Sequence, residues 1–279
     1  NKYLTFLGMG LLFMASACND GYEKEPVEHF TLDYVFSRVD SAGIQSRYFL
    51  NNIYLEHLYS GYNRIDGDFL DAASDDAISI DNNSPEIYKL FMGRYSAVSR
   101  LRDMEWGAYY QGIRKANILI NNIDVVPFNL TYVNALGETK PLNYTMKAEA
   151  RFLRAYFYFE LVKRYGGVPL VGDNVYVLGD DVQLPRNTFA QCIDYIIGEL
   201  DEIKDDLRSL PMSDATEFAH APTKETCLAM KARVLLYAAS PLFNEKPLEA
   251  GNELIGYASY DSQRWNLAAQ AAKDLIDQY

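Results

Sequence analysis

The side chains best suited to acid–base or metal chemistry in this chain are three histidines and several pairs of neighbouring acids. His29, His57 and His220 lie far apart in the sequence and match no metal-ligand spacing such as HExxH. The acid pairs are Asp75-Asp76, Asp180-Asp181 and Asp205-Asp206. Such pairs are common in acidic loops, and nothing about them requires a general acid and a general base. Because the sequence also lacks P-loop, GxGxxG and GxSxG motifs, we expect a protein that is not an enzyme and that carries no cofactor and no metal.

One acidic loop contains the oxygen ligands that calcium prefers, in Asp66-Gly67-Asp68 and Asp71. The loop lacks the ordered D-x-D-x-D-G spacing and the terminal glutamate of a calcium-binding loop. The sequence alone leaves calcium binding open here, and we do not count the loop as a metal site.

The amino terminus has the pattern of an export signal. Lys2 is followed by an apolar run from Leu4 to Ala17, which is too short to span a bilayer, since about 20 residues are needed. Cys18 comes directly after three small residues, Ala15-Ser16-Ala17, which is the arrangement of a lipoprotein cleavage site. We therefore expect a lipid on Cys18. The alternative is an ordinary signal peptide with a chance cysteine.

The predicted division of the chain is a lipoprotein signal peptide at 1–17, a tether and extended segment at 18–39, and a helical domain at 40–279. The chain begins with Asn1 in place of methionine, and a helical pattern continues to Tyr279 without a Gly or Pro stop. These features are expected for a longer protein that has been truncated at its carboxyl end.

The acidic composition argues against nucleic acids and anionic lipids as partners of this protein. A net charge of −12 and a pI of about 4.7 give a surface that repels nucleic acid phosphates and anionic lipid. We expect no nucleic acid partner, and attachment to a membrane by the lipid anchor only. The 22 tyrosines suit half-exposed groove positions and helix seams equally. Cys192 and Cys227 lie in apolar helical patterns without CxxC or CxxH spacing, which predicts buried, unreactive thiols.

The elements that would position a ligand are helices, and the most distinctive one runs from about Tyr144 to Tyr165. Gly166-Gly167 and Pro169 follow it and predict its end. Its apolar residues form two opposite stripes, Ala150-Leu153-Phe157-Leu161 and Ala148-Phe152-Tyr156-Phe159-Val162. A helix that is apolar on two sides packs between neighbours on both, so we expect it inside a stack of helices.

Further helices are predicted on both sides of this one. The cleanest apolar seam has a 3-4 spacing and consists of Trp106, Tyr109, Ile113, Ala116, Ile120 and Ile123. Other helices are predicted to begin near Asp40, Pro85, Thr188, Thr223 and Trp265. The outer face of the helix after Thr188 carries Glu199, Asp201, Glu202, Lys204, Asp205 and Asp206, which predicts a solvated surface.

This pattern predicts a mainly α fold of irregular tetratricopeptide-like helix pairs with long loops and minor β. No strict 34-residue period is visible in the sequence. A short hairpin is expected within 124–143, where Pro and Gly interrupt the helical pattern.

Four segments, in this order, resemble the SusD/RagB family of nutrient-binding outer-membrane lipoproteins. They are the site at Cys18, WGAYYQGIRKANILINNI at 106–123, AEARFLRAYFYFELVKRYGGVPLV at 148–171, and RNTFAQCIDYIIGELDEI followed by APTKETCLAMKARVLLYAAS. The second segment matches the family's W-x-x-x-Y-x-x-I-x-x-A-N pattern through Trp106, Tyr110, Ile113, Ala116 and Asn117. Because family members are considerably longer, the chain resembles their amino-terminal part.

The resemblance implies a surface-exposed lipoprotein that captures oligosaccharides and hands them to a SusC-type TonB-dependent outer-membrane channel. Such a protein is anchored by its lipid to the cell outer membrane, faces the exterior, and acts by binding instead of catalysis. One alternative is an oligopeptide-binding uptake lipoprotein of the RagB kind. Another is a helical-repeat adaptor that holds other proteins without a small ligand, and a lipid-anchored hydrolase comes last.

For a sugar ligand, aromatic side chains stack on the flat C–H faces of the rings, while Asp and Arg hydrogen-bond the hydroxyls. The acidic stretch 62–83 has no helical period, and rigid helices would display it together with the short helix that follows. The candidate ligand-binding residues are Tyr62, Phe69, Asp75, Asp76, Tyr88 and Arg94. Trp106, Phe152, Phe157 and Trp265 are expected in the core of the scaffold instead.

Overall fold

The computed structural model describes residues 31–58, 69–79, 85–96, 98–99, 105–177, 179–211, 221–245, 248–249 and 251–278. The chain divides into two compact units, residues 1–35 and 36–279. In the first unit, the described residues include the short helix α2 (Leu32–Val35). The predicted signal peptide and Cys18 lie outside the described residues, so both stay predictions.

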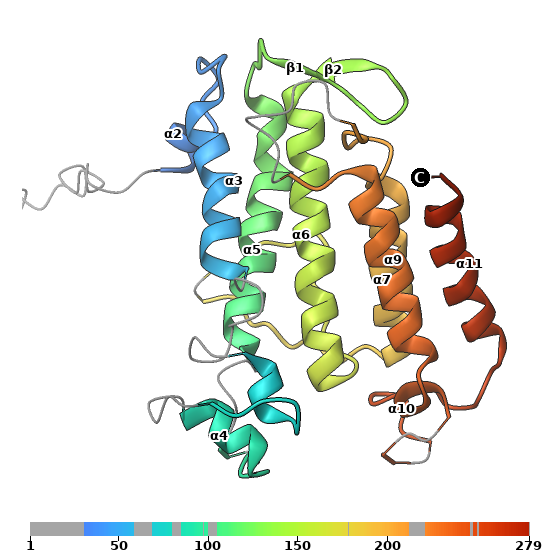
Figure 1. The fold of residues 1–279 in the computed structure, drawn as a ribbon. Coiled ribbons are helices and arrows are strands. Elements are labelled where there is room, and N and C mark those ends of the chain that lie inside the picture. The colour runs from blue at the N-terminus through green and yellow to red at the C-terminus, as the bar shows by residue number, and fades with distance from the viewer. Residues whose placement is uncertain are drawn as a thin grey trace, which may run out of the picture. The chain divides into compact units, whose positions relative to one another are not determined.

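The second unit is built mainly from helices (Figure 1). They are α3 Ile44–His57, α4 Pro85–Phe91, α5 Trp106–Asn122, α6 Leu142–Tyr165, α7 Phe189–Ile203, α9 Lys224–Ala239, α10 Pro241–Asn244 and α11 Gln263–Gln278, with 3-10 turns η3 at Leu70–Ala73 and η4 at Ile123–Val125. Strands β1 (Thr131–Val133) and β2 (Thr139–Pro141) form an antiparallel hairpin in which Tyr132 pairs with Lys140. The predicted mainly α fold with minor β is confirmed.

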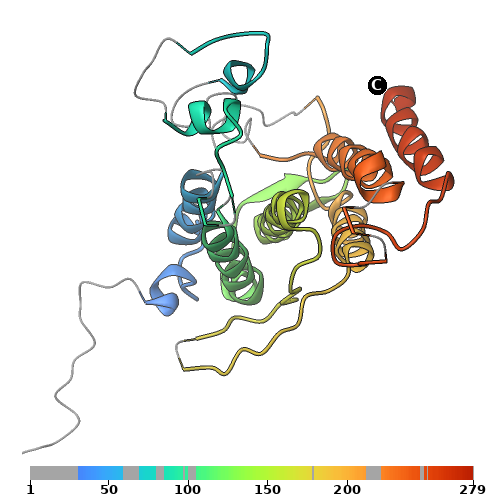
Figure 2. The ribbon, with the colours of Figure 1, turned by 90° about the horizontal axis from the view of Figure 1, so that it is seen from below.

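The long helices follow one another side by side in chain order. Contacts join α3 to α5, α5 to α6, α6 to α7, α7 to α9 and α9 to α11. Each of these helices runs antiparallel to the next (Figures 1 and 2). This is the arrangement expected of tetratricopeptide-like pairs.

Helix α6 lies between neighbours on both sides, as its two apolar stripes predict. On one stripe Leu153, Phe157 and Leu161 are fully buried, and on the other Phe159 and Val162 are nearly so. The helix ends where Gly166 takes a φ of +71°, and a Cβ at that position would meet the carbonyl oxygen of Leu254 at 2.2 Å. Three charged residues of α6 are also buried, namely Glu149, Arg154 and Glu160.

Helix α3 begins at Ile44, four residues after Asp40, where the sequence predicts a helix start. The Asp40 carboxylate accepts the N–H groups of Ala42 at 3.2 Å and Gly43 at 3.0 Å, so it holds the preceding turn. Gly43 then takes a left-handed φ of +59° immediately before the helix. Asp40 is therefore a turn residue and not a helix cap.

The acidic face of α7 and of the turn after it is solvated in part, as the sequence predicts. Glu199 is buried, but the Glu202 side chain is 68% exposed, and the side chains of Asp201, Asp205 and Asp206 are 39%, 38% and 42% exposed. Asp201 pairs with Lys231 at 2.7 Å, and Asp205 pairs with Lys224 at 2.8 Å. Asp206, just beyond the helix, pairs with Lys140 at 3.1 Å. Because α7 lies between α6 and α9, cations from neighbouring elements reach its acids.

The four aromatic residues that the sequence assigns to the core of the scaffold differ in burial. Phe157 is fully buried and Phe152 is 9% exposed, while Trp106 is half-buried. Trp265 is 40% exposed and lies outside the buried core of the described residues. Among the described contacts, α11 packs mainly on one helix, α9.

The predicted buried thiols are confirmed. Cys192 and Cys227 are free and buried, and burial raises the pKa of Cys227 to about 12. Within the described ranges, we find no helix that is long and apolar enough to cross a membrane. The same ranges contain no group of three His, Cys, Asp or Glu side chains placed to hold a metal ion.

Candidate functional site

The predicted ligand-binding residues that the structure describes gather on a small substructure formed by η3 and α4 (Figure 1). Its core consists of Ala72 and Ile87, both buried, with Leu70, Ala73 and Leu90 packed against them. This packing brings two segments together, 69–76 and 88–94, which contain five of the six predicted residues.

All five described candidates are exposed. Phe69 and Tyr88 are 56% and 59% exposed, and Asp75, Asp76 and Arg94 are exposed as well. Local bonds fix the backbone beside them: the Asp76 N–H donates to Ser74 Oγ at 3.2 Å, and the Arg94 N–H donates to Lys89 O at 2.8 Å. Tyr62 and the acidic loop 66–68 lie outside the described residues, so the assignment of Tyr62 as a ligand-binding residue stays a prediction.

The same substructure displays apolar side chains that the sequence reasoning missed. Phe91, Met92 and Tyr95 are 51%, 43% and 47% exposed. The ring centroids of Tyr88 and Phe91 are 6.5 Å apart. The sequence contained part of the signal, because residues 88 and 91 have the i, i+3 spacing of neighbours on a helix, whereas Tyr95 lies beyond the end of α4 at Phe91.

Polar side chains along one face of α5 hold the segment that follows α6. Four residues with spacing 4-3-4 donate to its backbone carbonyls: Tyr110 to Pro169 (2.8 Å), Arg114 to Tyr176 (3.0 Å), Asn117 to Gly172 and Asn174 (both 2.9 Å), and Asn121 to Asp173 (2.9 Å). Figure 2 shows this segment beside α5. Tyr110 and Asn117 are the polar members of the W-x-x-x-Y-x-x-I-x-x-A-N pattern, so the structure gives these two motif residues a role that their spacing alone did not reveal.

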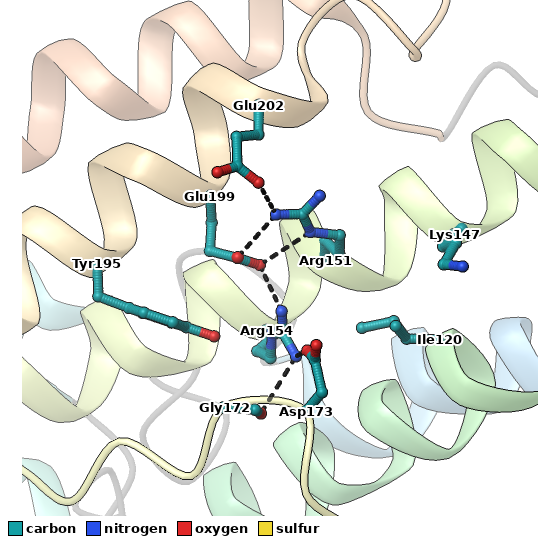
Figure 3. A pocket seen from close by; sticks show the side chains of 9 residues that line it. All are labelled: Ile120, Lys147, Arg151, Arg154, Gly172, Asp173, Tyr195, Glu199 and Glu202. Carbon is teal, nitrogen blue, oxygen red and sulfur yellow. Dashed lines mark hydrogen bonds and ion pairs between the residues drawn. The ribbon is translucent and has the colours of Figure 1, made fainter.

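A buried arginine joins three helices to that segment. Arg154 is 2% exposed, and its Nη1 donates to Asn117 Oδ1 at 2.7 Å and also to Asp173. Its Nη2 donates to Glu199 Oε2 at 2.7 Å (Figure 3). Burial lowers the pKa of Arg154, but electrostatic interactions with Tyr195 and Glu199 and hydrogen bonds to Glu199 and Asp173 outweigh burial, and the pKa is raised. The guanidinium therefore stays charged.

Arg151 extends this network one turn earlier on α6. It donates to Glu199 through Nη2 at 2.8 Å and Nε at 3.2 Å, and to Glu202 through Nη2. Glu199 thus accepts from both arginines. The sequence shows two i, i+3 pairs of like residues, Arg151 with Arg154 and Glu199 with Glu202. It does not show that the arginines of one helix pair with the glutamates of another.

A pocket of about 410 Å³ opens beside this network (Figure 3). It is lined by Ile120 of α5, Lys147, Arg151 and Arg154 of α6, Gly172 and Asp173 of the following segment, and Tyr195, Glu199 and Glu202 of α7. Two buried polar atoms of its lining residues, Arg154 Nε and the Tyr195 hydroxyl, have no hydrogen-bond partner among the described residues. Burial raises the pKa of Tyr195, so the phenol is neutral.

A family model described as "Starch-binding associating with outer membrane" matches residues 44–236. A SusD-like protein of Formosa agariphila, P38, is 25% identical over 239 residues, which cover 85% of this chain and 42% of that protein.

Solved structures show the same fold. A SusD-like protein from Bacteroides fragilis matches with a TM-score of 0.62 at 24% identity, over 89% of this chain and 40% of that one. A SusD homologue from Bacteroides thetaiotaomicron gives 0.61 at 21% identity, with 89% and 43% covered. A laminarin-binding SusD-like protein gives 0.56 at 20% identity, with 71% and 41% covered.

The chain spans about two fifths of the length of these relatives. The matching family model covers more than half of the chain, from the start of α3 into α9. The chain therefore belongs to the SusD-like family.

Proposed function

We propose that this protein captures oligosaccharides at the outer surface of the outer membrane and passes them to a SusC-type TonB-dependent channel. The activity is binding, and no chemical step is involved. The description of the matching family, starch-binding and associated with the outer membrane, supports this proposal. So does the likeness to a laminarin-binding protein.

The observation that carries the proposal is the exposed aromatic surface of the η3–α4 substructure. Phe69, Tyr88, Phe91 and Tyr95 are each about half exposed, although apolar rings of this size are usually buried in a soluble protein. Exposed aromatic side chains can stack on the C–H faces of sugar rings. The neighbouring acids Asp75 and Asp76 are exposed and can accept hydrogen bonds from sugar hydroxyls.

The anchoring part of the proposal depends on Cys18. A lipid on this thiol would hold the protein on the membrane, with the acidic residues that follow as a tether. We expect Cys18→Ala to move the protein from the outer-membrane pellet to the soluble fraction, while Cys192→Ala leaves it in the pellet. Full retention of the Cys18→Ala protein in the pellet would refute the anchor.

Isothermal titration calorimetry tests the binding proposal with three probes: laminarin oligosaccharides, malto-oligosaccharides and a mixture of oligopeptides. We expect heat from an oligosaccharide, and a loss of affinity of at least tenfold for Tyr88→Ala and for Phe91→Ala. The matched control is Tyr48→Ala on α3, which removes a tyrosine that is 64% exposed and far from η3 and α4 in sequence.

The outcomes separate the alternatives. Binding of oligopeptides but not of sugars would replace the glycan proposal with peptide uptake. Binding of no probe, together with co-purification of an unrelated soluble protein, would replace uptake with an adaptor role. Unchanged sugar affinity in both aromatic variants would remove the η3–α4 surface from the site.

A further inference from the structure

We propose that Ser74 is a positioning residue of the glycan-binding surface on η3 and α4, where its hydroxyl holds Asp76 in place to accept a hydrogen bond from a sugar. The inference rests on the proposed function, because it assumes that this surface binds a glycan. It adds a residue that acts on the ligand only through Asp76. It also accounts for how an exposed segment can present a carboxylate in a fixed arrangement.

The Ser74 hydroxyl joins the end of η3 to the acidic residues that follow it. Ser74 Oγ donates to Asp71 O at 2.7 Å, and the backbone N–H of Ser74 donates to the same oxygen at 3.0 Å. The hydroxyl oxygen accepts the backbone N–H of Asp76 at 3.2 Å. A serine hydroxyl has one donor and two acceptor positions, so it can make both of its bonds at once. The backbone from Asp71 to Asp76 is thereby held through one side chain.

The segment that contains Asp76 has little else to hold it. Residues 75–78 are all exposed, so no buried side chain fixes them. Within the described ranges, the bond from the Asp76 N–H to Ser74 is the only hydrogen bond that these four residues make. Without this bond, the backbone at Asp76 would gain conformational freedom, and a ligand would have to order it on binding. Ordering a segment on binding reduces affinity.

The turn that Ser74 closes is itself fixed to α4. Ala72 of η3 is buried and packs with Ile87 of α4. The Ala72 N–H donates to Phe69 O at 3.1 Å, so Phe69 begins the turn that Ser74 ends. The exposed Phe69 ring and the Asp76 carboxylate are therefore carried by one hydrogen-bonded turn. Ser74 sets the carboxylate relative to an aromatic ring, and sugar recognition uses these two kinds of group together.

A double-mutant cycle of Ser74→Ala and Asp76→Ala tests this assignment. Isothermal titration calorimetry measures the affinity of each protein for laminarin oligosaccharides and malto-oligosaccharides. We expect Ser74→Ala to weaken sugar binding about fivefold in the wild-type background, because Asp76 loses its fixed place. In the Asp76→Ala background the same substitution should weaken binding less than about twofold, because the group that Ser74 positions is gone. Ser74→Thr keeps the hydroxyl and should bind within about twofold of the wild type.

A merely structural role of Ser74 predicts a different result. Loss of the turn would then weaken binding by the same factor in both backgrounds. Ser240→Ala is the matched control, because Ser240 Oγ donates to Tyr237 O, three residues earlier, at 2.7 Å. This bond lies at the carboxyl end of α9, outside η3 and α4. We expect Ser240→Ala to leave sugar affinity unchanged.

The results distinguish this inference from the proposed function. If Tyr88→Ala weakens sugar binding while Ser74→Ala does not, Ser74 is not a positioning residue and the proposed function stands. An equal loss of affinity from Ser74→Ala in both backgrounds, or an equal loss from Ser74→Thr and Ser74→Ala, would also overturn the inference alone. If no sugar binds the wild-type protein, the inference and the proposed function both fail.

Discussion

The buried carboxylate of Glu149 should make the stability of the protein depend on pH in an unusual direction. Glu149 lies on α6 and is 5% exposed. It accepts from Tyr54 Oη of α3 at 3.2 Å and from Thr145 Oγ1 at 3.5 Å, and Arg208, which follows α7, lies 3.9 Å away. Burial raises the pKa of Glu149 to about 7, although Arg208 and both hydrogen bonds act to lower it.

The direction in which the unfolding free energy changes with pH follows from proton linkage. The folded protein binds the Glu149 proton more tightly than the unfolded chain does, because the pKa is raised from its ordinary value of 4.5. The stabilisation from this group is complete below pH 4.5 and is lost as the pH rises through 7. A pKa difference of 2.5, at about 1.36 kcal/mol for each pKa unit, corresponds to about 3 kcal/mol of unfolding free energy.

Glu149→Gln tests this reasoning, because glutamine is nearly the same size, can accept the same hydrogen bonds and does not titrate. Urea unfolding of both proteins at several pH values between 4.5 and 8 gives two curves of unfolding free energy. Subtracting the wild-type curve from the variant curve removes the contribution of the other titrating groups. Between pH 4.5 and 8, the stability of the variant relative to the wild type should rise by about 3 kcal/mol. Glu245→Gln, at an exposed position, serves as the control variant. A constant difference for Glu149→Gln, or a shift of opposite sign, would refute the reasoning.

Three further predictions concern the scaffold, each measured as the change in unfolding free energy. Asn117→Ala removes hydrogen bonds to Gly172, Asn174 and Arg154 and should cost about 3 kcal/mol, whereas Asn121→Ala, which removes one exposed bond, should cost under about 1 kcal/mol. Gly166→Ala should cost more than Gly172→Ala, because both need positive φ but only the Cβ at 166 meets backbone. Thr188→Ala removes the capping box of α7 and should cost about 1 kcal/mol, whereas Thr188→Ser should cost little. Equal costs within any of these pairs would contradict the corresponding assignment.

The sequence predicted the helices well because their signals are local. The apolar seam of α5 lies within one helix of 17 residues, and the two stripes of α6, with the glycine that ends this helix, lie within about two dozen residues. Helix periodicity depends on spacings of three and four residues, which a single sequence displays directly. The exposure of Trp265 was not predicted, because periodicity shows which residues share a helix face but not which neighbours cover that face.

The buried charge network could not be predicted in the same way. Arg154 lies 45 residues from Glu199 and 37 from Asn117, and nothing in their local sequence connects them. A charged residue inside a helical pattern is normally assigned to the surface, since burial of a charge is costly unless it is paired. Each pairing depends on the order in which α5, α6 and α7 pack, which is a property of the fold.

These pairings explain why two separate sequence patterns occur together in this chain. Asn117 belongs to the W-x-x-x-Y-x-x-I-x-x-A-N pattern, and Arg154 belongs to the long helix before Gly166-Gly167. In the structure both bind the Gly172 carbonyl oxygen, and Asn117 also accepts from Arg154. Removal of either side chain would leave the other with a buried polar group that has lost a partner. The two patterns therefore share one hydrogen-bond network. This network holds the segment after α6 against α5, and that segment forms one wall of the pocket.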